Sequence, residues 1–189
     1  MQIFTNFRRI FAGFLLALLM MWSTVQAGPV KLNDQSNEIK IVQNTNLGFK
    51  ASYSLSSFNA MDIKTEKGIF SRIIIPSYSK SGEFGNPELP VRSELIEIPV
   101  NAQVRVNIIN VDIKEYKLKD IGIQYPLIPN QPPVPKTGEI PEFIYNKNVY
   151  KINAFSQEEL VSVEVLGSMR GVTLGRLDIR PFRYNPVTG

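Results

Sequence analysis

Residues 82–102 read GEFGNPELPVRSELIEIPVNA, and this stretch decides how the chain is expected to fold. A glycine-asparagine turn that begins at Gly85 is followed by Pro87 and Pro90, which hold the backbone extended. An apolar run rich in β-branched residues then continues to Pro99. This order of turn, prolines and apolar run is typical of the start of a β-strand.

Apolar and polar residues alternate along most of the chain, and this period of two is the pattern of a β-strand. It predicts strands over residues 49–55, 61–65, 69–75, 104–113, 161–165 and 172–184. Between Ile108 and Ile109 the apolar side chains change face, which fits either a β-bulge or a strand buried on both faces. No segment after residue 27 combines helical spacing with capping residues. We therefore expect an all-β fold, an antiparallel sandwich or open barrel of short strands, preceded by a helical signal peptide.

The first residues have the pattern of an export signal. Two arginines precede an apolar run over residues 10–22, and small residues follow it. The run is shorter than the roughly 20 apolar residues that span a bilayer, so we interpret residues 1–27 as a signal peptide cleaved between Ala27 and Gly28. The mature chain is then expected in the periplasm or outside a bacterial cell, with no membrane contact after cleavage.

Two further segments follow the signal peptide. Residues 28–47 are polar apart from one short apolar stretch, and we expect a flexible lead-in with one edge strand there. Residues 48–189 are long enough for one β-rich domain with its own core. Near the end, a turn sequence follows the strand predicted over residues 178–184, but no returning strand follows the turn. We expect either a domain truncated at its C-terminus or an unprotected edge strand.

The composition excludes most enzyme classes, because the chain contains no cysteine and no histidine. Ser-His-Asp and Cys-His catalysis and nearly all zinc sites need one of these residues, so we expect no catalytic, metal or cofactor site. Subtracting the two signal-peptide arginines from the net charge of +4 leaves 4 − 2 = +2. Basic residues are not clustered among aromatic ones, so nucleic acid is not an expected partner.

Residues 125–141 carry six prolines, a density that neither a helix nor a sheet interior accepts. We expect an exposed, largely extended loop, whose prolines fix the backbone before binding and so reduce the entropy lost in a groove. Within it, Pro135, Lys136 and Thr137 present one long cation in the form of a cleavage sequence for a protease that recognises basic residues. Alternatively, Lys136 is a surface lysine and the prolines form a rigid connector between two strands.

Four aromatic residues, Tyr125, Phe143, Tyr145 and Tyr150, flank this proline-rich segment. Such rings either form an exposed stacking surface or pack in the core and at its rim. An exposed surface would favour an alternative function, an exported β-sandwich module that binds a glycan or a protein partner.

Three stretches resemble the prosegments of gingipain-type, caspase-like cysteine endopeptidases. The first is the motif of Gly85, Pro87, Leu89 and Pro90 together with the strand over residues 95–99. The second and third are residues 104–111 and 180–189. Their order and separation extend the resemblance over about residues 48–189.

The resemblance implies an all-β propeptide that helps a following catalytic domain to fold and covers its active-site cleft until proteolysis removes it. The chain itself is then not an enzyme, and its partner is the catalytic domain of an Arg- or Lys-specific cysteine endopeptidase, in cis or in trans. In this family a basic residue of a prosegment loop is thought to occupy the specificity pocket, and the nearest match here is Lys136. We expect its ammonium group to pair with an acidic group in that pocket.

Overall fold

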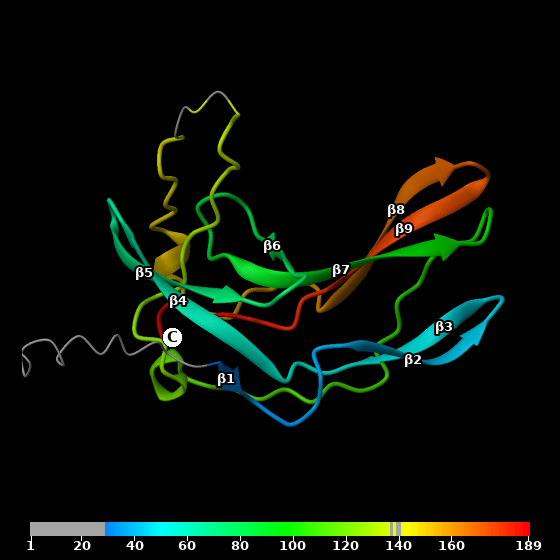
Figure 1. Ribbon diagram of the computed structural model, residues 1–189, viewed down its shortest axis with the longest axis horizontal. Coiled ribbons are helices and arrows are strands. Elements are labelled where there is room, and N and C mark those ends of the chain that lie inside the picture. The colour runs from blue at the N-terminus through cyan, green and yellow to red at the C-terminus, as the bar shows by residue number, and fades with distance from the viewer. Residues whose placement is uncertain (1–28, 137, 139–140) are drawn as a thin grey trace, which may run out of the picture.

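The computed structural model describes residues 29–136, 138 and 141–189, and β-strands dominate it (Figure 1). The strands are β1 (Val30–Lys31), β2 (Ile39–Thr45), β3 (Gly48–Tyr53), β4 (Ser57–Thr65), β5 (Gly68–Ile74), β6 (Ser79–Ser81), β7 (Leu89–Ile98), β8 (Val161–Met169) and β9 (Val172–Ile179). Two short 3-10 helices, η1 (Leu118–Ile121) and η2 (Val149–Lys151), complete the secondary structure of these residues. The expectation of a nearly all-β, antiparallel fold is confirmed, and the sheets among the described residues stay open.

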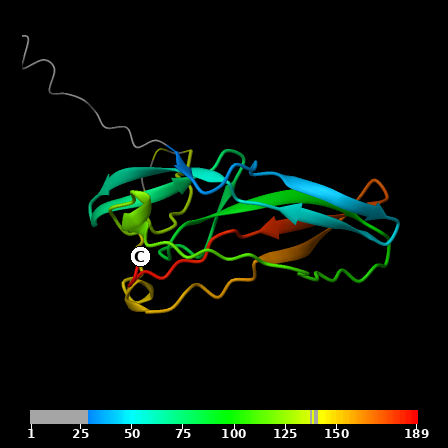
Figure 2. The ribbon, with the colours of Figure 1, turned by 90° about the horizontal axis from the view of Figure 1, so that it is seen from below.

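The strands form three antiparallel sheets, ordered β1-β4-β5, β2-β3 and β6-β7-β9-β8. Thr45 pairs with Gly48 and Thr65 pairs with Gly68 across the turns of two hairpins, and each threonine hydroxyl donates to the glycine carbonyl at 2.9 Å. The body is elongated, with the β4-β5 hairpin toward one end and the β2-β3 and β8-β9 hairpins toward the other (Figure 1 and Figure 2).

The main core lies where β4 and β5 meet the start of β7 and the C-terminal segment. Its buried members are Phe58, Ile73, Ile75, Leu89, Ile123, Leu127 and Tyr184. Phe58 and Phe182 pack edge to face, with ring centroids 5.5 Å apart. Burial of such side chains contributes about 1.5 to 3 kcal/mol each, and the chain has no cysteine with which to form a disulfide.

The prediction of a strand over residues 104–113 is wrong. Residues 103–117 form no strand, and their apolar side chains are largely exposed, Ile109 at 69% and Ile113 at 70%. Alternating apolar and polar residues suit the two faces of a strand, but a strand forms only where a neighbouring backbone can pair with it. Within the described residues the two register shifts lie elsewhere, at Ile41/Gln43 in β2 and at Val165/Gly167 in β8.

The segment expected as a lead-in contains β1 and β2. The expected edge strand is β2, which pairs with β3, whereas β1 pairs with β4 and places Val30 against the core. The signal peptide and its cleavage position between Ala27 and Gly28 lie outside the described residues. Among the residues that are described, no helix is long and apolar enough to cross a membrane.

The strand expected over residues 178–184 ends early. β9 stops at Ile179, and the following residues leave the sheet and bury Tyr184 in the core. The reason is Pro181, which cannot donate to a strand ladder. β9 lies between β7 and β8, so it is an inner strand and not the unprotected edge that the sequence pattern suggested.

Candidate functional site

Residues 131–144, called here the Lys136 loop, leave the body as two arms (yellow-green and yellow in Figure 1). The Lys136 side chain is exposed near the end of the outgoing arm, beside the exposed Pro135. The N–H of Gly138 donates to the carbonyl of Pro135 at 3.2 Å, which closes a turn around Lys136. Gly138 has φ +84°, a conformation that favours glycine at this turn. Thr137 lies outside the described residues.

The proline-rich segment is not exposed throughout, and this part of the sequence-based expectation is wrong. Leu127 is 1% and Ile128 is 2% exposed, and Pro129 is equally buried. Ile128 N–H donates to Ser71 O at 2.9 Å, while Ile128 O accepts from Glu88 N–H at 2.8 Å. Residues 127–130 therefore run between β5 and the segment before β7, and they form the buried base of the outgoing arm.

The glycine-asparagine turn of the opening motif joins both arms of the Lys136 loop. On the outgoing side, Gly85 N–H donates to Asn130 O and Asn130 N–H donates to Asn86 O, both at 2.8 Å. On the returning side, Asn146 N–H donates to Gly85 O at 3.0 Å, and the Asn146 side-chain amide donates to Asn86 Oδ1 at 3.0 Å. These four hydrogen bonds make the turn the common anchor of the two arms.

Gly85 is the residue that permits this close approach. Its φ is +88°, and a Cβ atom there would lie 2.9 Å from Ile144 Cγ2 and 3.1 Å from the backbone nitrogen of Asn146. Both distances are shorter than ordinary van der Waals contact, so any side chain would push the returning arm away from the turn.

The other motif residues connect the turn to the core. Pro87 forms an isolated antiparallel bridge with Pro129, and Leu89 is a buried core residue. Pro90 lies opposite Lys80 in the pairing of β7 with β6, between the pairs that Leu89 and Val91 form. The motif thus links the base of the Lys136 loop to the sheet that continues behind it.

The aromatic residues around the loop are used for packing. Phe143 on the returning arm, Tyr145 just after that arm and Tyr150 in η2 surround Phe70 of β5, with ring centroids 6.1, 5.6 and 6.4 Å from it. Burial raises the pKa of the Tyr150 hydroxyl well above its ordinary value, and that hydroxyl donates to Leu127 O at 2.7 Å. These three rings hold the arms to the body and do not form the open stacking surface of a glycan site. Tyr125, by contrast, is 36% exposed.

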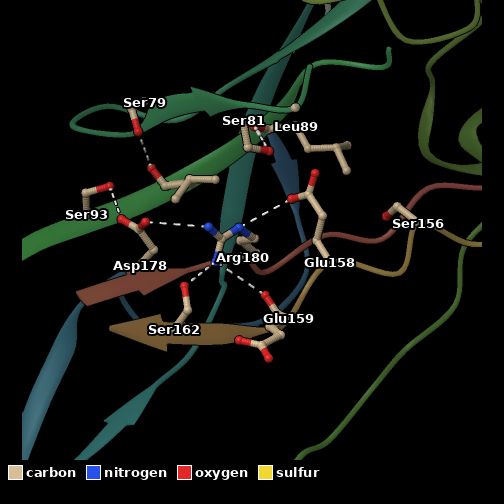
Figure 3. Close-up of polar contacts among 12 residues, drawn as sticks. Ser79, Ser81, Leu89, Ser93, Ser156, Glu158, Glu159, Ser162, Asp178 and Arg180 are labelled. Atoms are coloured by element: carbon tan, nitrogen blue, oxygen red, sulfur yellow. Dashed lines mark hydrogen bonds and ion pairs between the residues drawn. The ribbon is translucent and has the colours of Figure 1, made fainter. Parts of the chain in front are cut away.

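A polar groove of about 610 Å³ lies between β6, the β7-β9-β8 sheet and residues 158–159. Arg180 is at its centre (Figure 3): its guanidinium donates to Ser162 Oγ at 2.8 Å and lies 3.3 Å from Glu158 and 3.5 Å from Asp178. Asp178 is buried and also accepts from Ser93 Oγ at 2.6 Å. Arg180 therefore links residues 158–162 to the end of β9.

The sequence supplies no cysteine and no histidine, and the part that the structure describes holds no group of three or more acidic side chains able to bind a metal ion.

Comparison with known proteins gives concordant results. The family model Propeptide_C25 matches residues 31–189. Lys-gingipain of Porphyromonas gingivalis is 33% identical over 174 residues, which cover 90% of this chain and 10% of the relative. Lys-gingipain HG66 of the same species has the same identity and coverage. The chain therefore spans about a tenth of the length of these curated relatives.

Two solved structures share the fold. One, concerned with the zymogenic latency of gingipain K from P. gingivalis, has a TM-score of 0.78 and 32% identity, covering 85% of this chain and 89% of that chain. The other, a complex of the pro- and mature domains of RgpB from P. gingivalis, has a TM-score of 0.68 at 18% identity, covering 82% and 78%. Together with the family match, these similarities show that the chain belongs to the Propeptide_C25 family, the prosegments of gingipain-type cysteine endopeptidases.

Proposed function

We propose that this chain is the inhibitory propeptide of a C25 cysteine endopeptidase and that the Lys136 loop blocks the active-site cleft of the catalytic domain until proteolysis removes the propeptide. The observation that carries the proposal is the shape of the loop: an exposed lysine at a turn, on two arms anchored in the domain core. An anchored loop loses less conformational entropy in a cleft than a free peptide of the same sequence would.

Lys136 supplies the specific contact in this proposal. The matched relatives are named Lys-gingipain, and Lys136 presents a lysine side chain on an arm that prolines order. Its ammonium group pairs with an acidic group in the specificity pocket, where loss of water strengthens a charge-assisted hydrogen bond. The partner is accordingly the catalytic domain of a Lys- or Arg-specific cysteine endopeptidase, in cis or in trans.

The inhibition constant of the purified chain against C25 catalytic domains of its source organism tests this function. We expect the unmodified chain to inhibit, Lys136→Ala to inhibit at least tenfold more weakly, and Lys136→Arg to retain most of the inhibition if the pocket accepts either cation. Lys147→Ala is the control, because Lys147 is an exposed lysine on the body side of the returning arm. Equal inhibition constants for the unmodified chain and Lys136→Ala would remove Lys136 from the mechanism, and no inhibition at all would refute the function.

A second part of the proposed function is assistance in folding. An all-β domain with its own core can form first and then present a surface on which the catalytic domain folds. The test is the recovery of active catalytic domain after dilution from denaturant, with and without the chain. Recovery that the chain does not change would refute this role while leaving inhibition intact.

We also propose that the chain is exported, which follows from the arginines and the apolar run before residue 27. The test is the N-terminal sequence of the protein recovered from outside the bacterial cytoplasm. We expect it to begin at Gly28, and recovery of the protein in the cytoplasm with Met1 in place would refute export.

A further inference from the structure

The outgoing arm of the Lys136 loop lacks the means to pair with the returning arm through its backbone. Pro132, Pro133 and Pro135 have no N–H group, so only Val134 and Lys136 keep a donor on the exposed part of this arm. An antiparallel ladder needs donors and acceptors on both strands. The prolines that stiffen the outgoing arm therefore prevent it from forming a ladder of backbone hydrogen bonds with the returning arm.

The side chain of Gln131, directly before these prolines, takes the place of the missing backbone pair. Its Nε2 donates to Ile144 O at 2.7 Å, and its Oε1 accepts from Ile144 N–H at 2.9 Å. A carboxamide has the same donor and acceptor as a peptide group, so the two bonds reproduce a hydrogen-bonded pair of an antiparallel ladder. We call this contact the Gln131 bridge.

The Gln131 bridge is itself oriented by the outgoing arm. Gln131 Nε2 also lies 3.0 Å from Pro129 O and 3.2 Å from Asn130 O. Pro129 is buried and Asn130 is fixed to the Gly85-Asn86 turn, so the side-chain amide is held over a rigid part of the backbone. Along the described residues of the two arms, no hydrogen bond joins the arms beyond this bridge.

We infer that Gln131 is a positioning residue for inhibition: its carboxamide fixes the separation of the two arms and thereby the direction in which Lys136 projects. This inference rests on the proposed function and adds to it a residue that does not enter the cleft. Loss of the bridge leaves the core intact but lets the arms separate, so that Lys136 samples many orientations. The loop then loses more conformational entropy when it binds, and binding is weaker.

The variants Gln131→Ala and Gln131→Met test the inference, because methionine preserves the length of the side chain and removes both hydrogen bonds. We expect each to raise the inhibition constant roughly 3- to 30-fold, the effect of losing two exposed hydrogen bonds, with a melting temperature close to that of the unmodified chain. Gln124→Ala, at an exposed glutamine outside the loop, is the matched control and should change neither quantity. Full inhibition by Gln131→Met would overturn the inference.

A double-mutant cycle with Lys136→Ala separates positioning from a contact of Gln131 with the enzyme. If Gln131 acts through Lys136, Gln131→Ala has a much smaller effect once Lys136 is alanine. An effect of equal size in both backgrounds would overturn the inference.

Two measurements on the free chain keep this test independent of the proposed function. Gln131→Ala should accelerate hydrogen exchange at the Ile144 amide and accelerate cleavage at Lys136 by trypsin, which requires a freely adaptable loop. If the unmodified chain inhibits no C25 enzyme, the proposed function fails, and these measurements still decide whether Gln131 fixes the loop. Unchanged exchange and unchanged trypsin cleavage would overturn the inference even if inhibition is found.

Discussion

The Glu88 carboxylate lies 2.8 Å from Nε of Arg72, although Arg72 is in β5 and Glu88 stands directly before β7. The same carboxylate lies 3.2 Å from the ammonium group of Lys80 in β6, and its side chain is only 5% exposed. One buried carboxylate therefore holds together three segments that meet at the base of the Lys136 loop. The two cations offset the cost of removing this carboxylate from water.

Glu88→Ala is expected to lower the free energy of unfolding by about 3 kcal/mol, because it leaves the half-buried Arg72 guanidinium without its partner. Chemical denaturation measures the change. Glu94→Ala is the control: Glu94 pairs with Arg92, but its side chain is 40% exposed, so its removal should cost below about 1 kcal/mol. An equal decrease in the free energy of unfolding in the two variants would show that the burial of Glu88 does not strengthen its ion pairs.

Gly85→Ala and Gly122→Ala should separate backbone strain from crowding. Both glycines have positive φ, +88° and +83°, but only Gly85 has neighbours within 4 Å of the Cβ position. Each substitution is expected to cost about 1 to 2 kcal/mol from the left-handed backbone, and Gly85→Ala a further 1 to 3 kcal/mol from overpacking against the returning arm. Denaturation midpoints of the two variants give the comparison, and identical midpoints would contradict the crowding seen at Gly85.

The buried tyrosine hydroxyls make the stability of the domain depend on pH under alkaline conditions. Burial raises the pKa of Tyr53, Tyr78, Tyr150 and Tyr184 above the ordinary value of 10.0. The hydroxyls of Tyr53 and Tyr78 lie 2.7 Å apart, and the desolvated pair resists ionisation. Above pH 10 the unfolded chain loses these protons first, so the free energy of unfolding falls as pH rises and is unaffected by these groups below pH 10.

Near-ultraviolet absorbance of tyrosinate measures this behaviour. Tyr53, Tyr78, Tyr150 and Tyr184 should ionise only together with unfolding. Reversible ionisation of these four tyrosines near pH 10 in a folded chain would contradict the burial of their hydroxyls.

Ile109→Ala and Ile123→Ala form a matched pair that tests the placement of residues 103–117. Ile109 is 69% exposed, so its truncation should change the free energy of unfolding by no more than about 0.5 kcal/mol. Ile123 is 2% exposed in the core, and its truncation should cost about 2 to 5 kcal/mol. A large cost at Ile109 would mean that this segment is a packed strand, as its alternation first suggested.

Alternation of apolar residues was sufficient to predict β4, β5, β8 and β9, because each forms a hairpin with a strand nearby in sequence. It failed for residues 104–113, whose pattern is as regular but which have no pairing partner among the described residues. Strand pairing depends on distant segments, and single-segment patterns carry no information about them.

In the candidate site, too, local features were predicted from the sequence and features that depend on distant segments were not. The sequence identified Lys136 as an exposed cation in a proline-rich loop, and the structure places it at a turn on that loop. It did not reveal that residues 127–130 are buried, because their hydrogen-bond partners, Ser71 and Glu88, are some forty to sixty positions away. Gln131 was also missed, although one signal was available: an amide side chain directly before two prolines is well placed to supply the bonds that the prolines cannot.

The position of Leu127, with 1% of its surface accessible, has a mechanical consequence. The outgoing arm continues without interruption into the hydrophobic core through residues 127–130, so the base of the arm cannot move unless Leu127 leaves the core. Removing Leu127 from the core costs part of the free energy that keeps the domain folded. Under the proposed function, full withdrawal of this arm from a partner is thereby coupled to the stability of the domain itself.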